Sequence, residues 1–90
     1  MGAAGVYFGR IFPLQGLVVI GRDPANPVPL DQDSTTSRRH AQIVEAGGMF
    51  QLQDLGSANG TFVNGARVTE VTLRPGDEVT IGGTRFRFEV

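Results

Sequence analysis

The chain has 90 residues, 40% of them apolar, so it is long enough to close one hydrophobic core but too short for two. It contains no cysteine, which excludes a disulfide framework and a thiolate metal site. Its formal net charge of −1 argues against a broad electrostatic surface for nucleic acid or for an anionic membrane.

The apolar runs are short along the whole chain. The longest, residues 17–20, is far below the roughly 20 residues that a transmembrane helix requires, and the amino terminus lacks the charged start and apolar stretch of a secretory signal. We therefore expect a cytoplasmic protein that does not bind membranes. Residues 1–90 are expected to form a single domain, and the strand predicted to end at Val90 leaves open that this domain was excised from a longer protein.

Two apolar segments in the first part of the chain, residues 6–12 and 17–20, are each predicted to be a β-strand. Residues 22–36 follow as a long loop, because this stretch contains three prolines and only Val28 and Leu30 as apolar anchors. Since proline is confined to the edges of sheets, the loop is predicted to be interrupted by a short edge strand. Long ordered loops on a compact β domain are more often functional than not.

Short strands separated by glycine-containing turns fill the rest of the chain. The clearest is residues 85–90, where Phe86, Phe88 and Val90 alternate with charged residues. Many short strands without a helical window predict a β-sandwich or a barrel. The other predicted strands are residues 41–44, 50–53, 61–63, 67–68 and 79–81. Tight hairpins, which need positive φ, are predicted at Gly47 with Gly48, Asn64 with Gly65, and Gly82 with Gly83.

Three polar clusters lie at the ends of predicted strands. They are Gly21 with Arg22, the SRRH segment at residues 37–40, and the SANGTFVNG segment at residues 57–65. Each cluster taken alone is explained by ordinary turn chemistry. Together they supply one permanently charged fork, one hydroxyl and one amide, which are the groups that can hold a phosphate attached to a peptide.

No catalytic or metal-binding constellation is evident in the sequence. The chain has one histidine, and carboxylates such as Asp54 and Asp77 are scattered over predicted turns. No nucleophile is paired with a general base in this pattern. The residues Asp23, Asp31 and Asp33 lack the glycine and glutamate that complete a calcium loop. We therefore expect a protein that is not an enzyme and that uses no metal and no cofactor.

The order and spacing of the three clusters resemble the forkhead-associated (FHA) domain. GR is followed after 14 residues by SRRH and after 16 more by SANGTFVNG, and a PGD turn and an IGG segment come later in the chain. The resemblance extends from about residue 6 to residue 90. It implies an all-β sandwich of two twisted, mainly antiparallel sheets with about eleven strands and with the binding loops at one end. It also implies that the domain recognises phosphothreonine in a partner protein.

The resemblance implies unequal roles for the residues of the clusters. Arg22 matches the main phosphate ligand, and Ser37 matches a hydroxyl that donates to a phosphate oxygen. Arg38 matches a position that contributes to the phosphate pocket in many members. Asn59 matches the asparagine that binds the peptide backbone beside the phosphorylated residue. Ala58 matches a position that often holds a hydroxyl and contacts the ligand, so here any contact must use its backbone or its methyl group.

Four further residues match positions that shape the loops and do not touch the ligand: Gly21, His40, Gly60 and Thr61. The partner implied is a threonine-phosphorylated protein or peptide, either a Ser/Thr kinase or its substrate, in kinase-dependent signalling or assembly. An alternative left open by the residues is a protein-interaction module of the same fold that binds its partners without phosphate.

Overall fold

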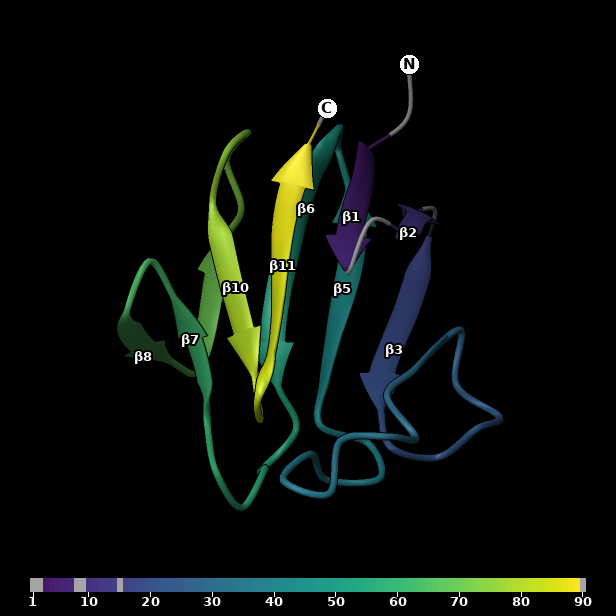
Figure 1. Cartoon of the computed structure of the whole chain (residues 1–90). Helices are drawn as coiled ribbons and strands as arrows, with labels where there is room; N and C mark the ends of the chain where they lie inside the picture. The colour runs from purple at the N-terminus through teal and green to yellow at the C-terminus, as the bar shows by residue number, and fades with distance from the viewer. Residues whose placement is uncertain (1–2, 8–9, 15, 90) are drawn as a thin grey trace.

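Two β-sheets pack face to face in the computed structural model, which describes residues 3–7, 10–14 and 16–89 (Figure 1). One sheet has the strand order β2 (Arg10–Leu14), β1 (Ala3–Tyr7), β11 (Thr84–Glu89), β10 (Glu78–Ile81), β7 (Thr61–Val63) and β8 (Ala66–Val68). The other has the order β4 (Val28–Pro29), β3 (Leu17–Gly21), β5 (Ala41–Ala46), β6 (Met49–Asp54) and β9 (Glu70–Thr72). The eleven strands of the described residues confirm the expected sandwich, and the pairing of β3 with β4 is the parallel one among them.

The strand predicted over residues 6–12 is wrong in one respect. The structure has two strands there, β1 and β2, which pair with each other as antiparallel neighbours with Val6 opposite Ile11. Residues 8 and 9, which connect them, lie outside the described residues, as does Val90 at the end of the last predicted strand. The prediction treated residues 6–12 as one continuous apolar segment. The short strand β9 was also not predicted, because Val71 is its one apolar residue.

The three predicted glycine hairpins are confirmed. Each joins two antiparallel strands through a two-residue turn, and the closing pairs are Ala46 with Met49, Val63 with Ala66, and Ile81 with Thr84. Positive φ occurs in all three turns, including φ 50° at the non-glycine residue Asn64. Local turn chemistry therefore sets the register of six strands.

The loop that follows β3 carries the predicted short edge strand. Within it, β4 pairs in parallel with β3, so that Ile20 lies opposite Val28. The two apolar anchors, Val28 and Leu30, are buried in the core. Leu30 also donates its backbone N–H to the carbonyl oxygen of Gly21 over 2.7 Å. The loop is therefore fastened to the sandwich near its middle.

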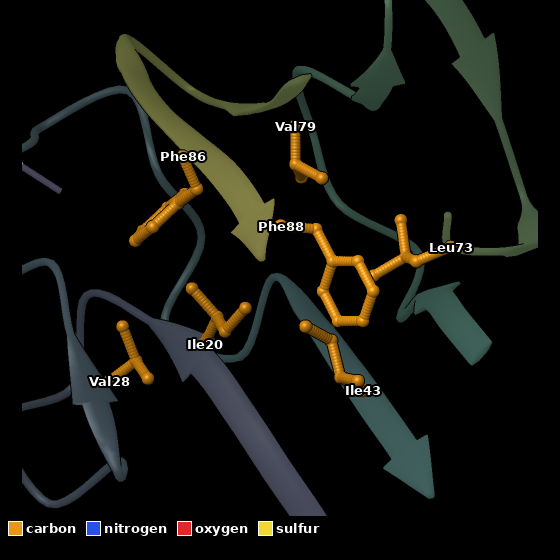
Figure 2. A pocket seen from close by; sticks show the side chains of 7 residues that line it. All are labelled: Ile20, Val28, Ile43, Leu73, Val79, Phe86 and Phe88. Carbon is orange, nitrogen blue, oxygen red and sulfur yellow. The ribbon is translucent and has the colours of Figure 1, made fainter. Parts of the chain in front are cut away.

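The core lies between the two sheets. Alternating side chains of β11 send Phe86 and Phe88 inward, and Figure 2 shows Ile20 and Ile43 of the other sheet pointing toward them. The cavity between these side chains is only about 20 Å³ and is lined by apolar groups. Because that volume has room for only about one water molecule, the core acts as a scaffold and not as a ligand pocket.

Three loops that connect strands meet at one end of the sandwich, the lower end in Figure 1. They are the loop from β3 to β5, the loop from β6 to β7 and the turn from β10 to β11. The two ends of the chain are marked at the opposite end of the molecule. Among the described residues there is no helix with the length and apolar character to cross a bilayer.

Candidate functional site

The first two polar clusters lie side by side because their backbones are paired. The N–H of Arg22 donates to the carbonyl oxygen of Ser37 over 2.9 Å, and the N–H of Asp23 donates to that of Arg38 over 3.2 Å. Gly21 makes this approach possible. A Cβ added at Gly21 would lie 2.0 Å from the carbonyl oxygen of Arg38, a distance that no side chain can occupy.

The guanidinium of Arg22 is exposed and is held at its inner end. Its Nε donates to the carbonyl oxygen of Thr36 over 3.1 Å, while its terminal nitrogens have no partner among the described residues. An open pocket of about 370 Å³ is lined by Arg22, Asp23, Pro24 and Arg38. Two arginines on one pocket favour an anionic ligand, and the planar guanidinium suits the paired oxygens of a phosphate.

Ser37 connects the second cluster to the third. Its hydroxyl oxygen accepts a hydrogen bond from the backbone N–H of Ala58 over 3.2 Å. The hydroxyl proton of Ser37 therefore points elsewhere, and no acceptor for it lies among the described residues. Ala58 is exposed, so its methyl group lies at the surface beside this hydroxyl.

His40 is fully buried, with 0% exposure, and contacts both the Ser37 loop and the Gly60 loop. Its Nδ1 accepts the backbone N–H of Ser37 over 3.1 Å, and its Nε2 lies 2.7 Å from the carbonyl oxygen of Gly60. Because Nδ1 accepts, the ring proton must be on Nε2, which donates to Gly60. Both ring nitrogens are occupied, so the imidazole has no atom left for a ligand or for proton transfer.

Asn59 lies at the exposed tip of the loop between β6 and β7. Its Nδ2 donates to the carbonyl oxygen of Thr35 over 2.6 Å, across 24 residues of sequence. Its Oδ1 and second amide hydrogen have no partner among the described residues. An acceptor and a donor side by side can pair with the N–H and C=O groups of a bound peptide.

Asp54 organises the Asn59 loop, a role that the sequence interpretation missed. Its carboxylate accepts from the backbone N–H groups of Gly56 and Ser57 and from the hydroxyls of Ser57 and Thr61, over 2.6 to 3.1 Å. Burial alone would raise the pKa of Asp54, but these hydrogen bonds outweigh it and lower that pKa. Gly60 closes the loop with φ 87°, and its N–H donates to the Ser57 hydroxyl over 3.0 Å.

Asp33 is the second carboxylate whose role was missed. It accepts from the backbone N–H and the hydroxyl of Thr35 and also from Gly83 and Thr84 on the turn between β10 and β11. Burial again works to raise its pKa, and the hydrogen bonds from Thr35 and Thr84 lower it well below the ordinary range. The spacings Asp33 to Thr35 and Asp54 to Gly56 are typical of Asx turns, and this signal could have identified both residues.

The structure thus brings Arg22, Ser37, Arg38, Ala58 and Asn59 to one end of the sandwich, with His40 and Gly60 beneath them. Thr61 is buried and lies behind the loop, bonded to Asp54. Within the described part of the chain, no group of three or more His, Cys, Asp or Glu side chains is placed to hold a metal ion.

Comparison with protein families and curated proteins gives consistent results. The family model of the FHA domain matches residues 18–82. The glycogen accumulation regulator GarA of Mycolicibacterium smegmatis is 50% identical over 68 residues, which are 76% of this chain and 42% of GarA. The oxoglutarate dehydrogenase inhibitor of Corynebacterium diphtheriae is 46% identical over 68 residues, which are 76% of this chain and 47% of that protein. The chain therefore spans less than half the length of these two relatives.

Solved structures resemble the sandwich over its whole length. A structure from a study of phosphothreonine-dependent FHA domain interactions has a TM-score of 0.94 and 33% identity, and the match covers 100% of this chain and 97% of the other. EmbR of Mycobacterium tuberculosis, solved in complex with a low-affinity phosphopeptide, has a TM-score of 0.93 and 36% identity. That match covers 99% of this chain and 24% of EmbR.

Proposed function

Because the chain belongs to the FHA domain family, we propose that it binds phosphorylated threonine in a partner protein. The observation that carries the proposal is the convergence of Arg22, Ser37 and Asn59 on one end of the sandwich, each with hydrogen-bonding groups that no described residue uses. A charged fork and a hydroxyl suit a phosphate, and an amide suits a peptide backbone.

The phosphate group provides most of the binding energy. A phosphothreonine carries about −1.5 to −2 charges near neutral pH and three acceptor oxygens, and the fork of Arg22 can meet two of them. Hydrogen bonds with an ionised partner contribute roughly 1.5–3 kcal/mol each, and ordering the ligand subtracts from their sum. The expected result is a micromolar interaction, near about −8 kcal/mol, which is reversible.

Within this proposal the site residues have distinct roles. Arg22 and Ser37 bind the phosphate, and Arg38 adds positive charge to the pocket that it shares with Arg22. Asn59 binds the peptide backbone. Ala58 contacts the peptide through its methyl group or its carbonyl oxygen, since its N–H already donates to Ser37. The remaining residues build the frame: Gly21, His40, Gly60 and Thr61.

The test is a binding titration with a phosphothreonine peptide chosen from a library with degenerate flanking residues. We expect micromolar binding of this peptide and no measurable binding of its unphosphorylated twin. The family further suggests weaker binding of the matching phosphoserine peptide, which lacks the methyl group. Equal affinity for the phosphorylated and unphosphorylated peptides would overturn the proposal and favour a module that binds partners without phosphate.

The proposal also covers the setting in which the domain acts. The partner is a Ser/Thr kinase or a protein that such a kinase phosphorylates, and the chain contributes binding and no catalysis. Because Ser/Thr kinases take their phosphate from ATP, a cytoplasmic location suits this role. Residues 1–90 act as a single domain, since both sheets share one core.

A further inference from the structure

The side chain of Asp33 fastens one recognition loop to a turn of the opposite sheet. Its Oδ2 accepts from the backbone N–H of Gly83 over 2.8 Å and from the hydroxyl of Thr84 over 2.7 Å. Its Oδ1 accepts from the backbone N–H of Thr35 over 3.0 Å and from the Thr35 hydroxyl over 2.5 Å. One carboxylate therefore uses both oxygens to join segments about fifty residues apart in sequence.

The loop and the turn are also in close contact around Asp33. A Cβ added at Gly82, which has φ 60°, would lie 2.4 Å from the Thr36 hydroxyl oxygen and 2.9 Å from that of Thr35. Thr84 is 3% exposed and Thr36 is 2% exposed, so part of the contact between the loop and the turn is buried. The position of Thr35 relative to β11 is thus fixed by packing as well as by Asp33.

Thr35 in turn contacts the side-chain amide of Asn59, the group proposed to bind the peptide backbone. The carbonyl oxygen of Thr35 accepts the Nδ2 hydrogen of Asn59 over 2.6 Å. An exposed asparagine otherwise rotates freely about its terminal torsion, and its amide oxygen and nitrogen exchange places. An acceptor held in a fixed position selects one orientation, in which Nδ2 faces Thr35 and Oδ1 is left for the ligand.

We propose that Asp33 is a positioning residue of the phosphopeptide site: it holds the Thr35 carbonyl against the turn between β10 and β11, and through that carbonyl it orients the Asn59 amide. The inference rests on the proposed function. Asp33 does not touch the ligand. Its effect is to prepare the Asn59 side chain before binding, which removes the loss of side-chain freedom from the binding step.

The experiment alters Thr84, the buried residue that donates to Asp33, because this change does not alter any of the residues proposed to touch the ligand. Thr84→Val removes the hydroxyl that donates to Asp33 and preserves the shape of the side chain, and Thr84→Ser retains the hydroxyl. Thr80→Val on the neighbouring strand is the matched control, because the Thr80 hydroxyl has no partner among the described residues. Affinity for the phosphothreonine peptide from the library is measured by titration in each variant.

We expect Thr84→Val to weaken binding about three- to tenfold, and Thr84→Ser and Thr80→Val to bind like the unmodified protein. In an Asn59→Ala background, Thr84→Val should cause no further loss, because the side chain that it misorients is gone. Asp33→Asn should show the same dependence on Asn59. Equal loss in both backgrounds would overturn the inference and leave Asp33 as a residue that only stabilises the fold.

A second measurement needs no ligand. In a ¹H–¹⁵N spectrum of the free protein, the side-chain amide signals of Asn59 should shift in Thr84→Val and stay in place in Thr84→Ser and Thr80→Val. An unmoved Asn59 signal in Thr84→Val would overturn the inference even where the peptide still binds. If the unmodified protein bound no phosphopeptide, the proposed function would fail and the inference would fail with it.

Discussion

The Nε of Arg22 donates a hydrogen bond to the carbonyl oxygen of Thr36, 3.1 Å away, and Thr36 is 2% exposed. The inner end of an exposed guanidinium is therefore held by a buried residue, while its terminal nitrogens have no partner among the described residues. This arrangement orients the fork before a ligand arrives. It also means that Arg22 has a small structural role in addition to its proposed role in binding.

Replacing Arg22 with alanine should weaken phosphothreonine-peptide binding by at least about a hundredfold, because a charged two-pronged contact is lost. The affinity of Arg22→Lys should lie between that of the unmodified protein and that of Arg22→Ala, since lysine keeps the charge but cannot form the two-pronged contact. Arg39→Ala is the control, because Arg39 is exposed and its side chain has no partner among the described residues. Titration gives the affinities, and unaltered binding by Arg22→Ala would contradict the assigned role.

Binding should weaken as the pH falls through about 6, where the phosphate takes up its second proton and loses charge. Below that value the affinity should fall by up to about tenfold per pH unit, because the dianion is the ligand. The measurement is a series of titrations from about pH 7.5 to 5, with circular dichroism at each pH to show that the domain stays folded. A constant affinity over this range would exclude the dianion as the species bound.

His40→Ala should lower the free energy of unfolding by about 2–4 kcal/mol, because it leaves the N–H of Ser37 and the carbonyl of Gly60 without their buried partner. Urea denaturation measures this change. The adjacent exposed variant Arg39→Ala should change stability by no more than about 0.5 kcal/mol. Similar small effects for both variants would show that the imidazole does not hold the loops together.

Two glycines at the recognition end should respond oppositely to alanine. Gly21→Ala should unfold or strongly destabilise the domain, because its Cβ would lie 2.0 Å from the carbonyl oxygen of Arg38. Gly83→Ala should be tolerated, because its Cβ would meet no atom closer than 3.6 Å and its N–H to Asp33 is kept. Thermal unfolding compares the two, and a tolerated Gly21→Ala would mean that the pairing of residues 22–23 with 37–38 is dispensable.

Acid should destabilise the domain through Asp33 and Asp54. Hydrogen bonds lower the pKa of both carboxyls in the folded state, despite the opposing effect of burial. The unfolded chain therefore binds protons more readily than the folded one. The stability from these groups is complete above the unfolded value of 3.8 and is lost as the pH falls below it toward the folded values.

Denaturant titrations from pH 5 to about 2.5 measure this loss. Asp54→Asn should be less stable at pH 5 and should depend less steeply on pH. A steep acid loss that remained unchanged in both Asp54→Asn and Asp33→Asn would assign the effect to other carboxylates.

The fold could be predicted from the sequence where the signal is local. Alternation of Phe86 and Phe88 with charged residues identified β11, and Asn64 with Gly65 identified a hairpin whose register the structure confirms. Strands without a clear pattern of their own were missed. Val71 alone could not reveal β9, and the apolar pattern of residues 6–12 did not show that β1 and β2 are separate strands.

The candidate site was predictable as a set of residue types and unpredictable as a network. Spacing pointed to Arg22, Ser37 and Asn59, but it could not show that Thr35 holds the Asn59 amide, because that contact joins two loops 24 residues apart. The link from Asp33 to Thr84 is more remote still. Such contacts depend on how the sheets are stacked, which no local pattern records.

The recognition loops belong to both sheets. His40 leads into β5 of the five-stranded sheet, and the Gly60 carbonyl that it contacts leads into β7 of the six-stranded sheet. A phosphopeptide that bridges Arg22 and Asn59 would therefore act as a clamp across the seam between the two layers. At a hundredfold excess over its dissociation constant such a ligand adds about 2.7 kcal/mol to stability, whatever its flanking sequence. The melting temperature of the domain is thus a label-free signal with which its physiological partner can be sought in pools of phosphorylated peptides.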